Sequence, residues 1–357
     1  MLIGEIAERL KAWNEGGKAG PLRMELHPTD RCNLRCIFCW RAANLNKNFP
    51  EMSERRLLKI PKEAAELGVK EWVISGGGEP LVRKEATLKV LKRIKQYDMW
   101  GLLTTNGTLL KERDAKFLVK IGWDQVQFSI DGPNPEINDY LRGKGSFEKI
   151  VQNIKILRKV KDNLKSNRPY IGFNTVLSRL NFDKLDDMMR LANEVGSELV
   201  YFEPLYPGYT SERLDLNGKE KALKKHVKNS SKTAKDLGID TNIDTFYEAS
   251  LTDKTNFREL VLKEVKGLVN GFISAPCFRP WYLMGIKASG FAGCCSTFEE
   301  GEFINKKNLK EVWFGKVFNK IRQNMIEKKI PDYCSKCSVV VVMENREIRN
   351  RLIGMGS

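Results

Sequence analysis

The chain has 357 residues, 41% of them apolar and 30% charged, with a formal net charge of +16. This size predicts a globular protein with one large and one smaller domain. The charged residues within the helical pattern of 1–13 exclude a signal peptide, and the longest tight apolar run, 339–343, is far too short to span a membrane. We therefore expect a cytoplasmic protein, in which eight cysteines are typical of metal ligands rather than disulfides.

The excess of 61 Lys and Arg over 45 Asp and Glu is of a kind seen in nucleic-acid-binding proteins. One concentration of it, 219–235, has the periodicity of a solvated amphipathic helix, and no RNA-binding motif accompanies it. A solvated basic surface or an acidic partner explains the charge better than a nucleic-acid substrate does. An RNA substrate therefore stays an alternative.

Short apolar, β-branched segments alternate with helical patterns along the first 205 residues. The predicted strands are 23–27, 71–75, 101–105, 126–130, 170–177 and 199–205. The predicted helices are 53–67, 84–96, 111–120, 147–161 and 182–195. Repeated strand–helix alternation predicts parallel strands joined by right-handed crossovers. The expected fold class is α/β, a partial (β/α)6 TIM-like barrel with its chemistry at the carboxyl ends of the strands.

The pattern changes after residue 205, where a polar stretch, two helices and a cysteine-rich region follow. The later helices are predicted at 219–237 and 256–269, and a hairpin at 281–287 and 291–295. The expected organisation is an N-terminal helix (1–20), the barrel (21–215), a helical connector (216–270), a C-terminal domain of a hairpin plus a helix (271–345) and a tail (346–357).

Cys32, Cys36 and Cys39 follow the first predicted strand with the spacing C-x3-C-x2-C. Three thiolates on one short loop can hold three irons of a [4Fe-4S] cluster and leave the fourth iron open for a small molecule. A zinc site or buried apolar thiols are the alternatives. The other motifs of the chain favour the cluster.

This spacing resembles that of the radical S-adenosylmethionine (SAM) enzymes. The resemblance implies that the open iron chelates SAM, and that reduction yields a 5'-deoxyadenosyl radical that removes a hydrogen atom from an unactivated C–H bond. It extends to the G-G-G-E-P turn at 76–80 and to the blocks at 104–108, 129–133 and 139–143. The implied SAM-binding residues are Phe38, Gly76, Gly77, Gly78, Glu79, Asn106, Ser129 and Arg142.

Each of these assignments has a physical reason and an alternative. Glycines let the backbone approach a ligand closely, although they more often mark a tight turn. The planar guanidinium of Arg142 suits the SAM carboxylate, but a surface ion pair would also explain it. Phe38 is expected against the adenine, or simply in the core.

Five further cysteines lie in the C-terminal third: Cys277, Cys294, Cys295, Cys334 and Cys337. Their order resembles the SPASM and twitch domains of the radical SAM subgroup that includes anaerobic sulfatase-maturating enzymes. The shorter twitch form fits better, because no cysteine follows Cys337. The resemblance implies an auxiliary [4Fe-4S] cluster on Cys277, Cys295, Cys334 and Cys337, with zinc as the alternative.

Cys294 is left over and has three interpretations. It is a buried thiol, an alternative ligand to Cys295, or a hydrogen-atom donor such as radical epimerases use. Adjacent strand residues point to opposite faces, so Cys294 could face the substrate while Cys295 faces the cluster. Glu203, at the end of the sixth predicted strand, is a candidate base or substrate ligand, or a structural carboxylate.

The expected reaction is hydrogen abstraction from a peptide side chain or a small metabolite such as a sugar. Oxidation is the first hypothesis, because a second cluster can accept the electron that remains after deprotonation. Epimerisation, RNA modification and a non-catalytic iron–sulfur electron carrier are the alternatives. The expected partners are the substrate and an external one-electron reductant of the flavodoxin or ferredoxin type, with no membrane.

Overall fold

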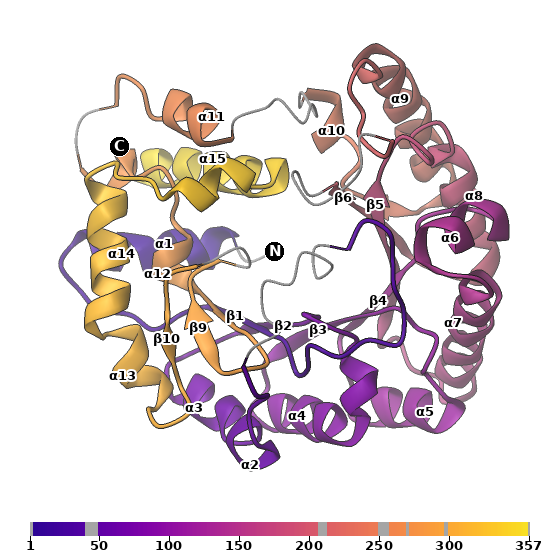
Figure 1. Cartoon of the computed structure of the whole chain (residues 1–357), viewed down its shortest axis with the longest axis horizontal. Helices are drawn as coiled ribbons and strands as arrows, with labels where there is room; N and C mark the ends of the chain where they lie inside the picture. Colours follow the sequence, from indigo (N-terminus) through magenta and orange to yellow (C-terminus); the bar gives the residue numbers. More distant parts are fainter. Residues whose placement is uncertain are drawn as a thin grey trace.

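The computed structural model describes residues 3–39, 49–205, 213–248, 257–268, 271–295 and 299–355. Its centre is a set of six parallel strands that stand side by side in chain order (Figure 1). They are β1 (Arg23–Leu26), β2 (Glu71–Ile74), β3 (Trp100–Thr105), β4 (Gln125–Ser129), β5 (Tyr170–Leu177) and β6 (Leu199–Pro204). The predicted α/β fold with a TIM-like parallel sheet is confirmed.

Helices cover the outer face of these strands (Figure 1). They are α2 (Glu54–Leu57), α3 (Ile60–Glu66), α4 (Lys84–Gln96), α5 (Glu112–Lys120), α7 (Ser146–Asn163) and α8 (Leu185–Val195). The helix predicted over 53–67 is two helices, because Pro61 lies in the first turn of α3, where a residue without an N–H is tolerated. The sequence pattern did not predict α6 (Pro135–Arg142). Asn134 caps its amino terminus by accepting the Ile137 N–H with its side chain.

The sheet continues beyond the six strands at both ends. β7 (Asp240–Thr241) pairs with β6, and β8 (Leu283–Ile286) pairs in parallel with β1. β9 (Phe291–Gly293) and β10 (Glu302–Phe303) follow as antiparallel neighbours. The cysteine-rich hairpin is therefore continuous with the barrel sheet, which places its loops beside the end of β1.

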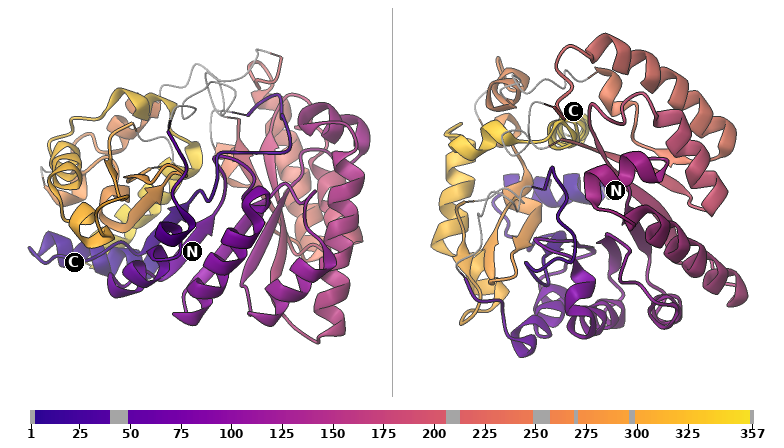
Figure 2. Two further views of the ribbon diagram at one scale, coloured as in Figure 1. Left: turned by 60° about the horizontal axis from the view of Figure 1, so that its bottom comes forward. Right: turned by 45° about the vertical axis from the view of Figure 1, so that its right-hand side comes forward.

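The remaining described elements are α1 (Ile3–Asn14), α9 (Glu220–Leu237), α10 (Thr245–Glu248), α11 (Phe257–Glu264), α12 (Arg279–Tyr282), α13 (Leu309–Trp313), α14 (Lys316–Ile326) and α15 (Val339–Met355), with short 3-10 turns η2 (Pro80–Arg83), η3 (Phe272–Ser274) and η4 (Asp332–Lys336). α15 runs without a break through residue 345 and packs against α1 and β6. It lies across the open side of the barrel, and Figure 2 shows it nearly end-on in the right-hand view. None of the described helices is long and apolar enough to cross a membrane.

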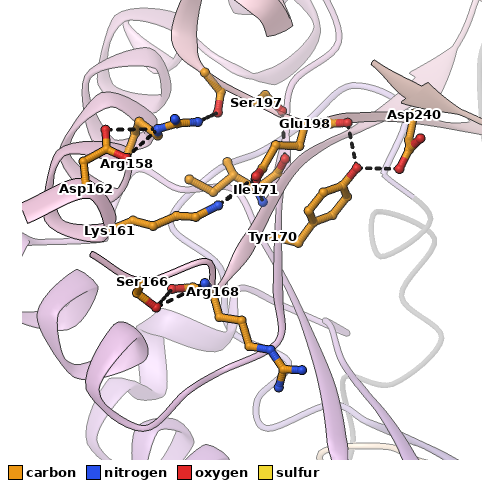
Figure 3. A network of polar contacts seen from close by, with 11 residues as sticks. Arg158, Lys161, Asp162, Ser166, Arg168, Tyr170, Ile171, Ser197, Glu198 and Asp240 are labelled. Atoms are coloured by element: carbon orange, nitrogen blue, oxygen red, sulfur yellow. Dashed lines mark hydrogen bonds and ion pairs between the residues drawn. The ribbon is translucent and has the colours of Figure 1, made fainter. Parts of the chain in front are cut away.

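A polar network closes the amino-terminal ends of β5, β6 and β7 (Figure 3). Lys161 Nζ lies 2.8 and 3.0 Å from the two carboxylate oxygens of Glu198. The Tyr170 hydroxyl donates to the Glu198 carbonyl at 2.9 Å and to the Asp240 carboxylate. The shallow hollow of about 730 Å³ beside this network has no cysteine among its described lining residues, so the candidate chemistry lies at the other end of the strands.

Candidate active site

A cavity of about 1260 Å³ occupies the inside of the barrel. Alternate residues of every central strand point into it, as strand geometry requires. On β4, for example, Gln125, Gln127 and Ser129 line the cavity, while Val126 and Phe128 are fully buried on the helix side. The cavity thus receives polar side chains from all six strands.

The loop after β1 brings Cys32, Cys36 and Cys39 to the carboxyl end of this cavity. Nitrogen donors surround the sulfurs: the Leu34 N–H lies 3.4 Å and the Asn106 amide 3.9 Å from Cys32 Sγ. Arg142 Nη1 lies 4.0 Å from Cys36 Sγ. Burial raises the pKa of Cys36 to about 11, and the nearby guanidinium opposes that rise. Three clustered thiols with N–H donors fit an iron–sulfur cluster, which holds its ligands as thiolates.

The glycine run packs directly against the cysteine loop. Gly78 N–H donates to the Thr29 carbonyl at 2.8 Å, and Glu79 N–H donates to the Arg31 carbonyl at 2.8 Å. A Cβ on Gly78 would lie 2.0 Å from that Arg31 oxygen, and one on Gly77 would lie 1.9 Å from Asp30 Oδ1. Gly78 is needed because two backbone segments touch there, and Gly77 because the Asp30 side chain lies against its backbone.

The Glu79 carboxylate joins the ends of β2 and β3. It accepts the Leu81 N–H at 2.9 Å, the Thr105 hydroxyl at 2.7 Å and the Asn106 N–H at 2.7 Å. Burial raises the pKa of Glu79, and these hydrogen bonds oppose the rise. Glu79 lines the cavity, so the same side chain braces the two loops and borders the space where a SAM ammonium is expected.

Arg142 is buried beside Asp131 rather than paired at the surface. Its Nε lies 2.6 Å from Asp131 Oδ2, and its guanidinium lies 5.4 Å from the ring centroid of Phe38. The other Asp131 oxygen accepts the Val176 N–H at 2.7 Å. Ser129 lines the same wall. The surface alternative for Arg142 is therefore wrong, because its guanidinium pairs with Asp131 of the 129–133 block in the interior.

The cysteines of the second set lie close to one another. The thiols of Cys295 and Cys277 are close enough to raise the pKa of Cys337, and those of Cys277, Cys295, Cys337 and Cys294 raise that of Cys334, although burial is the largest cause in both. The four cysteines proposed as ligands thus meet in one place. Among the described residues, no three His, Cys, Asp or Glu side chains are arranged around one metal ion; a four-iron cluster does not require that, because its thiolates bind different irons.

Cys294 lies in the hydrophobic core with 4% of its surface exposed. Burial raises its pKa well above the ordinary value, with Cys295 and Cys277 adding to the rise. Cys294 is not among the described residues that line the cavity. Its side chain therefore packs beside the second cysteine set rather than facing the barrel interior.

A buried ionic network joins β1, α12 and α15. Glu344 Oε1 lies 2.8 Å from Arg23 Nη1, and Glu344 Oε2 lies 3.2 Å from Arg279 Nη2. Arg23 also pairs with Glu71 at 3.1 Å. No motif identified Arg279 or Glu344; the available signals were the position of Arg279 two residues after Cys277 and a single carboxylate after the apolar run 339–343.

Glu203 lines the same cavity as Arg23, Arg279 and Glu344 of this network. Burial raises the pKa of Glu203 to about 7; Arg279 opposes the rise and Glu25 adds to it. A carboxyl group that titrates near neutrality is suited to accept a proton. His27 also lines the cavity, and burial with the nearby Lys287 lowers its pKa to about 4, so it is neutral. His226 packs against Phe182 with ring centroids 5.7 Å apart, and it is not among the described lining residues.

Comparison with known proteins agrees with this geometry. The model of the radical SAM superfamily matches residues 26–192, and that of an iron–sulfur cluster-binding domain, SPASM, matches 277–338. A probable GTP 3',8-cyclase of Methanocaldococcus jannaschii is 30% identical over 220 residues, 59% of this chain and 71% of that protein. A probable GTP 3',8-cyclase of Thermococcus kodakarensis is 34% identical over 184 residues, 51% of this chain and 56% of that protein. The chain spans 30%, 56% and 64% of the first three curated relatives.

Among solved structures, Streptococcus suis SuiB has the same fold. Its complexes with S-adenosylmethionine and with the precursor peptide SuiA give TM-scores of 0.65 and 0.64 at 19% identity. The similarity covers 87% of this chain and 70% and 69% of those chains. Both the barrel and the C-terminal region therefore have structural counterparts.

Proposed function

Because the chain belongs to the radical SAM superfamily and carries a SPASM domain, we propose that it oxidises a peptide side chain or a small polar metabolite. [4Fe-4S] clusters and SAM are the cofactors that these two domains imply. When bound and reduced, they supply a 5'-deoxyadenosyl radical that removes a hydrogen atom from the substrate. An external one-electron reductant completes the proposed set of partners.

The chain offers two ligand sets for these cofactors. Cys32, Cys36 and Cys39 would hold the cluster that binds SAM, and Cys277, Cys295, Cys334 and Cys337 would hold the auxiliary cluster. Arg142, oriented by Asp131, would bind the SAM carboxylate together with Ser129. Phe38 would lie against the adenine, while Asn106 and the 76–79 turn would border the methionine end.

One observation favours oxidation over the other candidate reactions. Arg279 is close enough to influence both the Glu203 carboxyl and the thiols of Cys277 and Cys337. The candidate proton acceptor Glu203, which lines the cavity, and the cysteines of the proposed electron acceptor, which are not among the described lining residues, are therefore both close to Arg279. A substrate radical that loses a proton to Glu203 and an electron to the auxiliary cluster would become the two-electron-oxidised product.

The other reactions have less support from the described residues. Epimerisation needs a thiol that reaches the substrate, and Cys294 is buried outside the cavity lining. The relatives' names suggest a purine nucleotide, but the described lining carries seven carboxylates and four cationic side chains. Among the described lining residues, acidic side chains thus outnumber basic ones, which favours a cationic substrate over a triphosphate.

The proposal is tested with protein reconstituted anaerobically with iron and sulfide, then reduced in the presence of SAM. We expect 5'-deoxyadenosine from the wild type and none from the variant with alanine at positions 32, 36 and 39. With the substrate present, the product should lack two hydrogens by mass spectrometry. Loaded wild type that forms no 5'-deoxyadenosine would instead indicate an electron carrier, and tight, salt-sensitive RNA binding would indicate an RNA-modifying enzyme.

A further inference from the structure

Two carboxylates in the cavity have no hydrogen-bond or ion-pair partner among the residues that the structure describes. Glu25 lies on β1 and Glu203 on β6, the first and last of the six central strands, and both line the cavity. The charge of Glu25 acts on Glu203 across the barrel. No hydrogen bond or ion pair joins either carboxylate to another residue in the described part of the chain. The pair therefore presents negative charge toward the space between them.

Two of the arginines that line the cavity form ion pairs with other carboxylates. Arg279 contacts the Glu344 carboxylate through Nε at 3.4 Å and Nη2 at 3.2 Å. Arg23 lies between Glu344 and Glu71 at 2.8 and 3.1 Å. Two guanidinium groups thus pair with two other carboxylates, and Arg279 acts on Glu25 and Glu203 only through its charge, without an ion pair to either.

Gln127 supplies an independent sign of a ligand. Only 6% of its surface is exposed, it lines the cavity, and no hydrogen bond joins its side chain to another described residue. A polar group that is nine-tenths buried and has no protein partner normally meets a ligand or ordered water. Gln127 stands on β4, between β1 and β6 in the strand order, and its amide is directed into the same space.

We propose that Glu25 and Glu203 bind a protonated amine of the substrate, with Gln127 bonded to a neighbouring polar group. This inference rests on the proposed function, and it narrows the substrate class to molecules that carry an ammonium group. Two carboxylates suit an ammonium ion because it has three N–H donors and a positive charge. The ammonium N–H that donates to Glu203 would also supply the proton that Glu203 accepts during the proposed oxidation.

The test measures binding of three probes with one carbon skeleton to the reconstituted, SAM-bound enzyme at pH 8. The probes are n-butylamine, n-butanol and butyrate, measured by isothermal titration calorimetry. We expect n-butylamine to bind at least tenfold more tightly than the other two. Glu25→Gln and Glu203→Gln should each weaken n-butylamine binding at least fivefold, while Glu347→Gln, at the exposed rim of the cavity, should leave it unchanged.

The same preparations separate this inference from the proposed function. Wild-type enzyme that forms no 5'-deoxyadenosine refutes the proposed function, whatever the probes do. Equal binding of the amine and the alcohol, no amine binding, or unchanged binding in both glutamine variants overturns the ammonium site alone. If Glu203→Gln weakens SAM binding but leaves n-butylamine binding intact, the Glu203 carboxylate binds SAM and the proposed ammonium site is overturned.

Discussion

Arg142 and Asp131 form a buried ion pair in which Nε lies 2.6 Å from Oδ2. Asp131 is held in turn by the Val176 N–H of β5 at 2.7 Å. One edge of the guanidinium is thereby fixed, and Nη1 lies near Cys36, 4.0 Å from its sulfur. This arrangement leaves a planar donor group beside the proposed cluster, where a carboxylate can bind through two hydrogen bonds.

Arg142→Lys should weaken SAM binding, because an ammonium group cannot reproduce the planar fork. Losing a charge-assisted pair should cost on the order of 1.5–3 kcal/mol, which corresponds to a roughly 10- to 150-fold higher Kd. Arg158→Lys, in an exposed pair with Asp162, is the matched control. Equilibrium dialysis with the reconstituted protein measures both, and an unchanged Kd in Arg142→Lys would remove Arg142 from the SAM site.

Two clusters predict about eight irons per reconstituted chain. Alanine at positions 32, 36 and 39 should leave about four irons and abolish SAM cleavage, because the auxiliary ligands come from a separate part of the chain. Alanine at 334 and 337 should also leave about four irons but retain SAM cleavage. Metal analysis checks both variants. Zinc in the C-terminal region together with about four irons would contradict the two-cluster assignment.

Gly78→Ala should prevent loading of the first cluster. The new Cβ would lie 2.0 Å from the Arg31 backbone oxygen, so either the 76–79 turn or the cysteine loop would have to move. Gly4→Ala, with nothing within 4 Å of its Cβ position, is the control and should load normally. The expected result is loss of about four irons in Gly78→Ala alone; full iron content with unchanged SAM cleavage would show that the two loops separate without consequence.

The strands and the cysteine loop could be predicted because their signals are local. Tyr170–Leu177 agrees residue for residue with the predicted fifth strand, since β-branched and apolar residues there lie between clear helical patterns. The C-x3-C-x2-C spacing and the glycine run are likewise contiguous in the sequence. Their packing against each other follows because β1 and β2 are adjacent parallel strands, whose carboxyl ends lie at the same edge of the sheet.

The pairing of distant segments could not be predicted in this way. β8 lies next to β1 although 260 positions of sequence separate the paired residues Leu26 and Ile286. The whole barrel lies between them in the chain, so no local pattern reveals the pairing. Glu344 follows an apolar run and could equally have faced solvent; only the fold brings it to Arg23 and Arg279. Sequence patterns give a residue's chemistry and periodicity, but an ion pair across three elements depends on tertiary contacts.

Glu203 predicts a pH dependence of both stability and turnover. Burial raises its folded-state pKa from 4.5 to about 7, with Glu25 adding and Arg279 opposing. Ionising Glu203 therefore destabilises the fold: the penalty is absent below about pH 4.5 and complete above about pH 7. Glu203→Gln should be more stable than the wild type at about pH 8, by roughly 3 kcal/mol, and equally stable at about pH 4.

Turnover should show the opposite dependence, because a base must be ionised to accept a proton. Product formation by the wild type should rise through about pH 7, and Glu203→Gln should cleave SAM but form little product. Anaerobic denaturant titrations and product analysis between about pH 6 and pH 8 measure the two effects. A flat wild-type profile with normal turnover in Glu203→Gln would leave Glu203 as a structural carboxylate.

Cys294→Ala separates oxidation from epimerisation. The thiol is 4% exposed and packs in the core beside Cys295 and Cys277, so we expect the variant to fold with a stability loss on the order of 1 kcal/mol. It should keep about eight irons and retain turnover. Cys295→Ala, the adjacent control, should lose the auxiliary cluster, because its thiol lies with those of Cys277, Cys334 and Cys337.

The remaining outcomes of this pair of variants are distinct. If Cys294 donates a hydrogen atom, Cys294→Ala should still cleave SAM but not complete the reaction. The native enzyme in deuterated water would then place one deuterium on the product carbon, because a thiol hydrogen exchanges with solvent. If Cys294→Ala loses iron and Cys295→Ala does not, Cys294 is the ligand and the assignment moves by one residue. Oxidation predicts neither deuterium incorporation nor loss of iron in Cys294→Ala. The product lacks two hydrogens and no thiol donor is needed, so buried Cys294 only fills space in the core.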